Sequence, residues 1–137
     1  MDIRLTDEPD ADARETILAG LIAFNAARAG PADRRPLAVL LHGDDGAVVG
    51  GLWGVTAWGW LFTELLFVPD DLRGRGLGRE LLGRAEAEAR ARGCRGAWLD
   101  TFAFQARGIY EQLGYRVFGE IEDYPPGSAR YFLSKRF

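Results

Sequence analysis

The sequence predicts an α/β domain with a mixed, mostly antiparallel central sheet that is flanked by helices. Its 137 residues are 47% hydrophobic and 27% charged, a composition typical of a globular chain that can bury a sizeable core. Apolar residues alternate in several short runs, which indicates strands, and recur at helical spacing in longer runs. The order of these runs favours a mixed sheet. No linker rich in Pro, Gly and Ser divides the chain, so residues 1–137 are expected to form a single domain.

The first expected elements are a short strand and a helix. Residues 2–6 alternate polar and apolar side chains, which predicts a strand. Pro9 and the acidic residues around it suit the start of a helix. The apolar positions at helical spacing are Ile17, Leu18, Leu21 and Ile22. The dipeptide Gly30-Pro31 is expected to end that helix.

Three consecutive strands are expected next, as an antiparallel meander. Residues 36–41 are a short apolar run, and the turn residues at 43–46 separate it from a second run at 47–56. Residues 58–68 form the third and longest run. Because short turns join neighbouring strands, the three runs should pair side by side.

Helices and strands alternate in the rest of the chain. The remaining expected elements are a helix from Leu77 that ends at Gly93, a strand at 95–101, a helix at 104–113, and strands at 115–121 and 130–137. Three Glu-to-Arg pairs four residues apart fall on the first of these helices: Glu80 with Arg84, Glu86 with Arg90, and Glu88 with Arg92. We expect all three pairs on its solvent-facing side.

Charge and composition exclude several classes of protein. A net charge of -3 makes non-specific nucleic-acid binding a poor expectation, because such binding requires basic patches. Cys94 is the only cysteine, so no intrachain disulfide can form and a reducing compartment is suitable. The charged N-terminus lacks the apolar core of a signal peptide, and no apolar run could span a bilayer. No His and Cys residues have metal-ligand spacing. We therefore expect a cytoplasmic protein without metal, membrane or nucleic-acid partners.

The chemistry of the sequence concentrates in a glycine-rich loop between a strand and a helix. Glycines and arginines alternate there: Arg73, Gly74, Arg75, Gly76, Gly78 and Arg79. A helix start presents unpaired N–H groups and the positive end of the helix dipole. Glycines let a ligand approach this backbone closely, and arginines add positive charge. The loop therefore predicts an anion cradle suited to phosphate.

Two other phosphate-binding motifs do not fit this loop. A P-loop requires Lys and Ser or Thr after its last glycine, whereas Gly78 is followed by Arg79 and Glu80. The Rossmann fingerprint would need its third glycine at Arg79. Asp100, which ends the next expected strand, imitates the acid that binds ribose in that fold. A nucleotide-binding protein of another fold is therefore the weaker interpretation.

Two motifs in order resemble those of one enzyme family. The pattern Arg73-x-x-Gly76-x-Gly78 resembles the pyrophosphate-binding signature of the GCN5-related N-acetyltransferase (GNAT) family. Residues 109–115, with Tyr110 and Gly114, resemble the second signature of that family. The element order also matches, so the resemblance covers essentially the whole chain. One departure is Ala103, where many relatives carry asparagine.

The resemblance implies an acyl-CoA N-acyltransferase fold with acetyl-CoA as cofactor. In this family the sheet splays between its fourth and fifth strands, here residues 58–68 and 95–101, and the pantetheine arm lies in the gap. A backbone N–H near Val68 would polarise the thioester carbonyl. The residues implied to bind acetyl-CoA are Leu66, Phe67, Val68, Arg73, Gly74, Arg75, Gly76, Leu77, Gly78, Arg79, Gln105, Gly108 and Tyr110.

Two residues are candidates for proton transfer. By resemblance, Tyr110 would donate a proton to the departing thiolate, which suits a phenol of pKa about 10. Glu64 is the candidate base, because it is an isolated carboxylate in an apolar strand and relatives often carry a glutamate there. Period two would place Glu64, Leu66 and Val68 on one side of the strand unless a bulge intervenes. A solvent-facing or structural Glu64 is the alternative.

The expected function is an acetyl-CoA-dependent N-acetyltransferase that uses direct attack in a ternary complex. The acceptor would be a small-molecule or peptide amine, and Tyr124 in the loop at 122–129 is a candidate to border it. A non-catalytic acyl-CoA-binding or sensor module is the alternative function. A homodimer is common among members of the family and is a further expectation.

Overall fold

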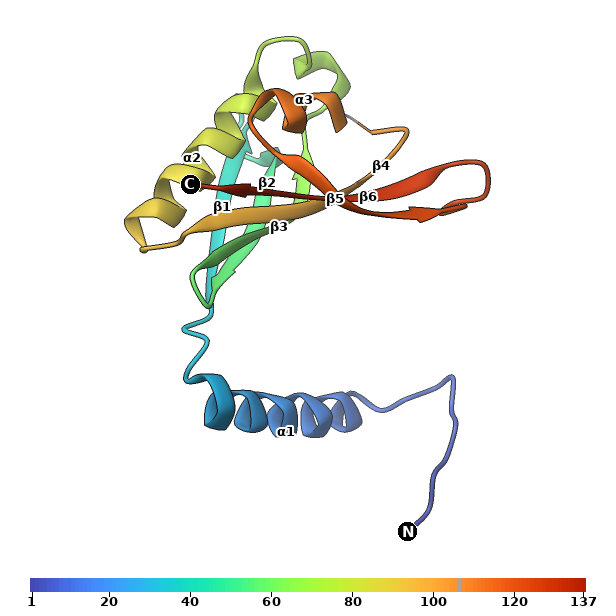
Figure 1. The fold of residues 1–137 in the computed structure, drawn as a ribbon. Coiled ribbons are helices and arrows are strands. Elements are labelled where there is room, and N and C mark those ends of the chain that lie inside the picture. Colours follow the sequence, from blue (N-terminus) through green and yellow to red (C-terminus); the bar gives the residue numbers. More distant parts are fainter. Residues whose placement is uncertain (106) are drawn as a thin grey trace. The chain divides into compact units, whose positions relative to one another are not determined.

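A computed structural model describes residues 1–105 and 107–137 (Figure 1). The chain divides into two compact units, residues 1–32 and 33–137. In the first unit, helix α1 (Ala11–Ala29) ends at Gly30 and buries none of its residues. Residues 1–10 contain no helix or strand and are all exposed. The strand predicted at residues 2–6 is therefore wrong, because alternation alone cannot make a strand without a hydrogen-bonded neighbour.

The second unit is a six-stranded sheet with the strand order β1-β2-β3-β4-β6-β5. Its strands are β1 (Arg35–His42), β2 (Val48–Ala57), β3 (Trp60–Phe67), β4 (Gly96–Phe102), β5 (Arg116–Glu122) and β6 (Ala129–Arg136). A 3-10 turn η1 (Asp70–Leu72) and helix α2 (Leu77–Ala91) connect β3 to β4, and the short helix α3 (Arg107–Gln112) connects β4 to β5. Every pair is antiparallel except β3 with β4, so the predicted mixed sheet is confirmed.

The sheet opens along the parallel pair between β3 and β4. Only four positions are paired, from Trp60 with Gly96 to Thr63 with Leu99. Beyond them β3 continues beside β2, and β4 continues beside β6. We call the point where the two strands part the fork. The expected opening is thereby confirmed, although it follows the third strand because the strand at residues 2–6 is absent.

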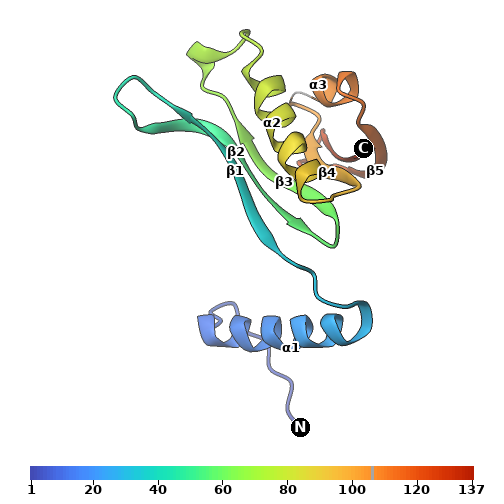
Figure 2. The same ribbon diagram turned by 90° about the vertical axis from the view of Figure 1, so that its left-hand side faces the viewer.

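Helix α2 covers one face of the sheet, as Figures 1 and 2 show. Its buried face carries Leu81, Leu82, Ala85 and Ala89. The sheet contributes Leu37, Leu52, Leu61, Leu99 and Leu133 to the same core. Each of these leucines is almost fully buried, and burying such a side chain contributes about 1.5–3 kcal/mol. This core fixes the start of α2, and so the glycine loop, beside the end of β3.

A β-bulge lies where β3 reaches the fork. Gly54 of β2 pairs with Thr63 while Trp53 pairs with Leu65, so Glu64 has no partner in this ladder. A Cβ atom at Gly54 would lie 2.5 Å from the carbonyl oxygen of Phe62. Only glycine therefore lets the two backbones approach this closely.

The bulge predicts a large difference between two glycine substitutions. Gly54→Ala should lower the free energy of unfolding by about 1–3 kcal/mol, because the added methyl group collides with backbone. Gly83→Ala is the matched control: it lies in α2 with no atom within 4 Å of its Cβ position, and it should be neutral or stabilising. Urea denaturation of both variants would decide, and equal stabilities would contradict the role of the bulge.

No helix in the described part of the chain is both long enough and apolar enough to cross a membrane.

Candidate active site

The glycine loop forms an open turn that leads into α2. Gly74 and Gly76 have φ angles of 77° and 76°, which favour glycine, and Gly76 is the N-cap of α2. No side-chain hydrogen bond from the described residues caps the start of this helix, so its first N–H groups remain available as donors. Space is open at the Cβ positions of Gly74, Gly76 and Gly78. This open turn is compatible with a bound anion, and the binding itself stays a prediction.

Arg73 ties the loop to Val68, the residue after β3, and Arg75 bonds within the connection. The Arg73 guanidinium donates from Nε to the carbonyl oxygen of Val68 at 2.9 Å and pairs with Asp70 at 2.8 Å. Arg75 donates to the carbonyl oxygen of Asp71 at 3.4 Å. The loop is therefore tied to the strand that was expected to meet the pantetheine arm.

Arg79 connects the two sequence motifs. Its guanidinium donates to the side-chain oxygen of Gln112, at the end of α3. Helix α3 also carries Tyr110, the candidate proton donor. Because of this bond, the start of α2 and the tyrosine helix lie side by side, although they are far apart in the sequence.

Tyr110 is half-buried and keeps its proton more firmly than a free phenol. Burial raises the pKa of Tyr110, and the negative charge of Asp100 raises it further. Its ring meets that of Tyr115 edge to face, with 6.1 Å between the centroids. A protonated phenol fixed in this way can act as a general acid toward a thiolate.

A buried ionic group lies beneath α3 and was missed by the sequence reasoning. Tyr115, only 2% exposed, donates from its hydroxyl to Oε2 of Glu86 at 3.1 Å. Lys135 donates from Nζ to Oε1 of Glu86 at 2.7 Å. Burial raises the pKa of Tyr115, and the Glu86 carboxylate raises it further. The three side chains join α2, the start of β5 and β6 directly behind Tyr110.

The expectation for Glu86 was therefore wrong. Glu80 with Arg84 and Glu88 with Arg92 form the predicted ion pairs, at 2.6 and 3.3 Å. Glu86 instead is 4% exposed and faces the sheet. Glu86 shares the buried face of α2 with Leu82 and Ala89, and this helical spacing is the one local sign that it points inward. Its partners Tyr115 and Lys135 lie far along the chain, so the sequence does not indicate them.

Glu64 lies at the fork and is exposed. The bulge at this residue interrupts period two, since Leu65 pairs with Trp53 and Leu66 with Leu52. The assignment of Glu64 and Leu66 to one side of the strand therefore does not apply. Its role as a base stays a prediction.

The other residues predicted to bind acetyl-CoA lie at the end of β3, in the turn after β4 and in α3. Leu66 and Val68 are half-buried at the end of β3, and Phe67 is exposed. Gln105 accepts hydrogen bonds at Oε1 from the Thr101 hydroxyl at 3.1 Å and from the Phe102 N–H at 2.9 Å, so this oxygen holds the turn after β4. Gly108 lies in α3, with open space at its Cβ position. Their contacts with a cofactor stay predictions.

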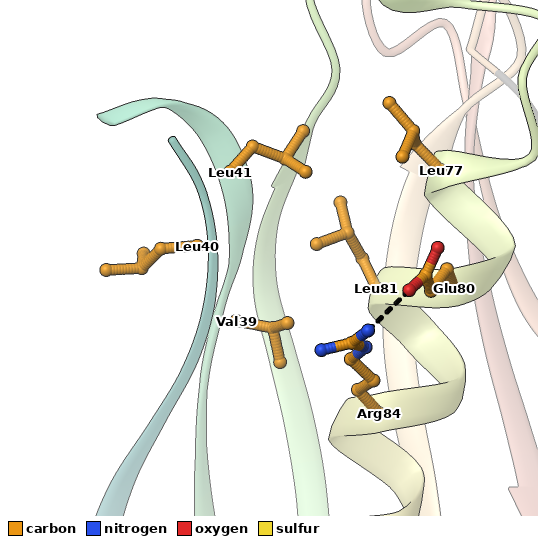
Figure 3. Close-up of a pocket in the computed structure, with 7 residues that line it drawn as sticks. All are labelled: Val39, Leu40, Leu41, Leu77, Glu80, Leu81 and Arg84. Carbon is orange, nitrogen blue, oxygen red and sulfur yellow. Dashed lines mark hydrogen bonds and ion pairs between the residues drawn. The ribbon is translucent and has the colours of Figure 1, made fainter. Parts of the chain in front are cut away.

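A hollow between β1 and α2 is a separate feature (Figure 3). It has a volume of about 150 Å³ and is lined by Val39, Leu40, Leu41, Leu77, Glu80, Leu81 and Arg84. Of the residues predicted to bind cofactor, only Leu77 borders it. It therefore does not coincide with the fork.

Comparison with known proteins gives the same family as the motifs. A sequence profile of the Acetyltransferase (GNAT) family matches residues 4–115. An acetyltransferase of Agrobacterium fabrum is 44% identical over 137 residues, which is all of both chains. The blasticidin-S acetyltransferase of Streptomyces morookaense is 44% identical over 118 residues, 82% of this chain and 87% of the relative. A crystal structure of an acetyltransferase from Agrobacterium tumefaciens matches with a TM-score of 0.96 at 44% identity over 100% of both chains.

These findings define the class of the protein. The fold is that of the GNAT acetyltransferases, with a glycine-rich turn into α2 and a sheet that opens between β3 and β4. The chain belongs to the GNAT family and is an acetyltransferase.

Proposed function

We propose that the enzyme transfers the acetyl group of acetyl-CoA to a primary amine by direct attack in a ternary complex. The observation that carries this proposal is the link between Arg79 and Gln112, which brings the open anion cradle beside the helix of Tyr110. A cradle for the pyrophosphate and an acid for the thiolate are the two groups that this reaction requires.

The residues at the fork fit a bound acetyl-CoA. The hydroxyl of Thr63 is buried, with the residue 5% exposed, and it has no hydrogen-bond partner among the described residues. A polar group in this position usually meets a ligand or water. We assign the pantetheine arm to the end of β3 at Leu66–Val68, and the pyrophosphate to the N–H groups of residues 73–79.

Each side chain has a defined part in the proposed reaction. The amine nitrogen attacks the acetyl carbon, the carbon–sulfur bond breaks, and the leaving thiolate takes the phenol proton of Tyr110. A backbone N–H near Val68 stabilises the charge on the carbonyl oxygen. Glu64, directly or through water, takes the proton that the amine must lose.

We propose a small-molecule amine as the acceptor. Support comes from the 44% identity with a blasticidin-S acetyltransferase over most of both chains. Blasticidin S is therefore the first acceptor to test, beside a peptide amine. A cytoplasmic location, a homodimer and the single domain at residues 1–137 stay predictions.

Acetyl-CoA should stabilise the folded protein against heat. A ligand at a hundred times its Kd adds about 2.7 kcal/mol to the free energy of unfolding. Differential scanning calorimetry with acetyl-CoA, ATP and NAD is the measurement, and only acetyl-CoA should raise the Tm. A Gly76→Val variant, which places a branched side chain at a φ of 76°, should lose most of this shift. An unchanged Tm with acetyl-CoA would contradict the proposed cofactor.

A further inference from the structure

A second carboxylate lies at the fork, on the strand opposite Glu64. Thr63 and Leu99 are the last paired residues of β3 and β4. The next residue of β3 is Glu64, and the next residue of β4 is Asp100. Two carboxylates therefore flank the beginning of the opening, one on each strand.

Asp100 is held by one of its two oxygens. Arg130 of β6 donates to Oδ1 from both Nε, at 3.0 Å, and Nη2, at 2.7 Å. The Asp100 side chain is 19% exposed, and no hydrogen bond to its Oδ2 occurs within residues 1–105 and 107–137. The carboxylate is thus fixed in direction while its second oxygen can accept a hydrogen bond from a ligand.

Asp100 has an electrostatic effect on Tyr110. The charge of Asp100 contributes, after burial, to the raised pKa of Tyr110. Because Asp100 is the first residue of β4 beyond its pairing with β3, a group that binds at Asp100 Oδ2 would lie beside the opening proposed to receive the thioester. This is the position that an attacking amine must occupy.

Aromatic rings surround Arg130, the partner of this carboxylate. Phe102 follows two positions after Asp100 and so points to the same side of β4. Its ring lies 5.5 Å from that of Tyr124, between centroids, and Arg130 donates to the Tyr124 hydroxyl at 3.1 Å. Arg130 therefore holds the loop with Tyr124 beside Asp100. A carboxylate next to aromatic rings suits an ammonium group on an apolar body.

The charges at the fork also favour a cation. Glu64 and Asp100 carry negative charge, and Arg130 offsets one of the two. We propose that Asp100 binds the ammonium group of a cationic amine acceptor through Oδ2 and orients it toward the thioester. This inference rests on the proposed acetyltransferase reaction, names its acceptor class, and gives Asp100 a role distinct from that of Glu64.

Asp100→Asn tests this assignment, because asparagine can still accept the bonds from Arg130 but has no charge. The probes are benzylamine, which is cationic at neutral pH, and aniline, which has similar size and is uncharged. Titration calorimetry of the CoA-bound enzyme should show benzylammonium binding that the Asp100→Asn variant weakens about 10- to 100-fold. Aniline binding should be the same in both proteins. Glu80→Gln, which removes a carboxylate from a surface pair on α2, should leave both affinities unchanged.

Arg130→Gln separates binding by Asp100 from a purely structural role. This variant removes the cation that neutralises Asp100, while the glutamine amide can still donate to Oδ1 and keep the carboxylate in place. Benzylammonium should therefore bind as tightly as in the wild type or more tightly. The proposal is overturned if the wild type does not bind benzylammonium, if Asp100→Asn binds it equally well, or if Arg130→Gln weakens it as much as Asp100→Asn does. Failure of the underlying reaction would show separately, as the absence of any Tm shift with acetyl-CoA.

Discussion

Tyr110→Phe should lower kcat by about 10²- to 10⁴-fold and leave the KM for acetyl-CoA nearly unchanged. The substitution removes the only proton that the tyrosine can donate, while the ring keeps its contacts with Tyr115. Without that proton the thiolate must leave as an anion or take a proton from water. Thiol release from acetyl-CoA in the presence of the acceptor measures the effect.

The pH dependence gives a second measure of the same role. Burial and Asp100 raise the pKa of Tyr110, so the protonated acid persists above pH 10 and is lost only at still higher pH. The wild type should therefore keep the acid-dependent part of kcat through pH 10. Tyr131→Phe is the control, because Tyr131 lies on β6 under Arg107 and has no proposed part in the reaction. Equal kcat values for Tyr110→Phe and the wild type would reject Tyr110 as the acid.

Lys135→Met should lower the free energy of unfolding by about 3–5 kcal/mol. Lys135 neutralises Glu86, whose side chain is only 5% exposed. Its loss would leave a buried carboxylate that keeps, among the described residues, the hydrogen bond from the Tyr115 hydroxyl. An uncompensated buried charge is among the costliest changes that a single substitution can cause. Equilibrium denaturation in urea measures the loss.

A double variant separates the buried charge from the lost packing. Glu86→Gln combined with Lys135→Met removes both charges, and the amide oxygen can still accept from Tyr115. Its stability should recover most of the loss, because a neutral replacement of a buried ion pair is often tolerated. If the free energy of unfolding of Lys135→Met alone is within about 1 kcal/mol of the wild-type value, the proposed role of this ionic group is contradicted.

Local patterns were sufficient for most of the fold. The glycines and arginines at residues 73–79, the apolar face of α2 and the turn at 43–46 each depend on neighbours in the sequence, so their structures could be predicted. The strand at residues 2–6 could not, because a strand depends on a partner that its own alternation does not supply. The break of period two at Glu64 depends on the close approach of Gly54 and Phe62, which lie on different strands.

The site was less predictable where its contacts are distant in sequence. Tyr110 and the glycine loop belong to short motifs, whereas their connection through Arg79 and Gln112 appears only in the folded chain. Glu86 was expected on the solvent side because arginine follows it at helical spacing. Asp100 was noticed only as an imitation of a ribose-binding acid, since neither its bond to Arg130 nor its place opposite Glu64 has a local signal.

The short pairing of β3 with β4 has a consequence for the order in which the enzyme folds. The meander of β1, β2 and β3 joins segments that are adjacent along the chain. Trp60 and Gly96, in contrast, are separated in the sequence by the whole of α2. Closing that longer loop costs more chain entropy and gains only four paired positions. The pairing of β3 with β4 should therefore form late in folding and separate early in unfolding. The proposed catalytic region thus lies along the strand pair with the fewest paired positions in the sheet. Inactivation by heat should therefore precede the melting of β1–β3 or of β4–β6.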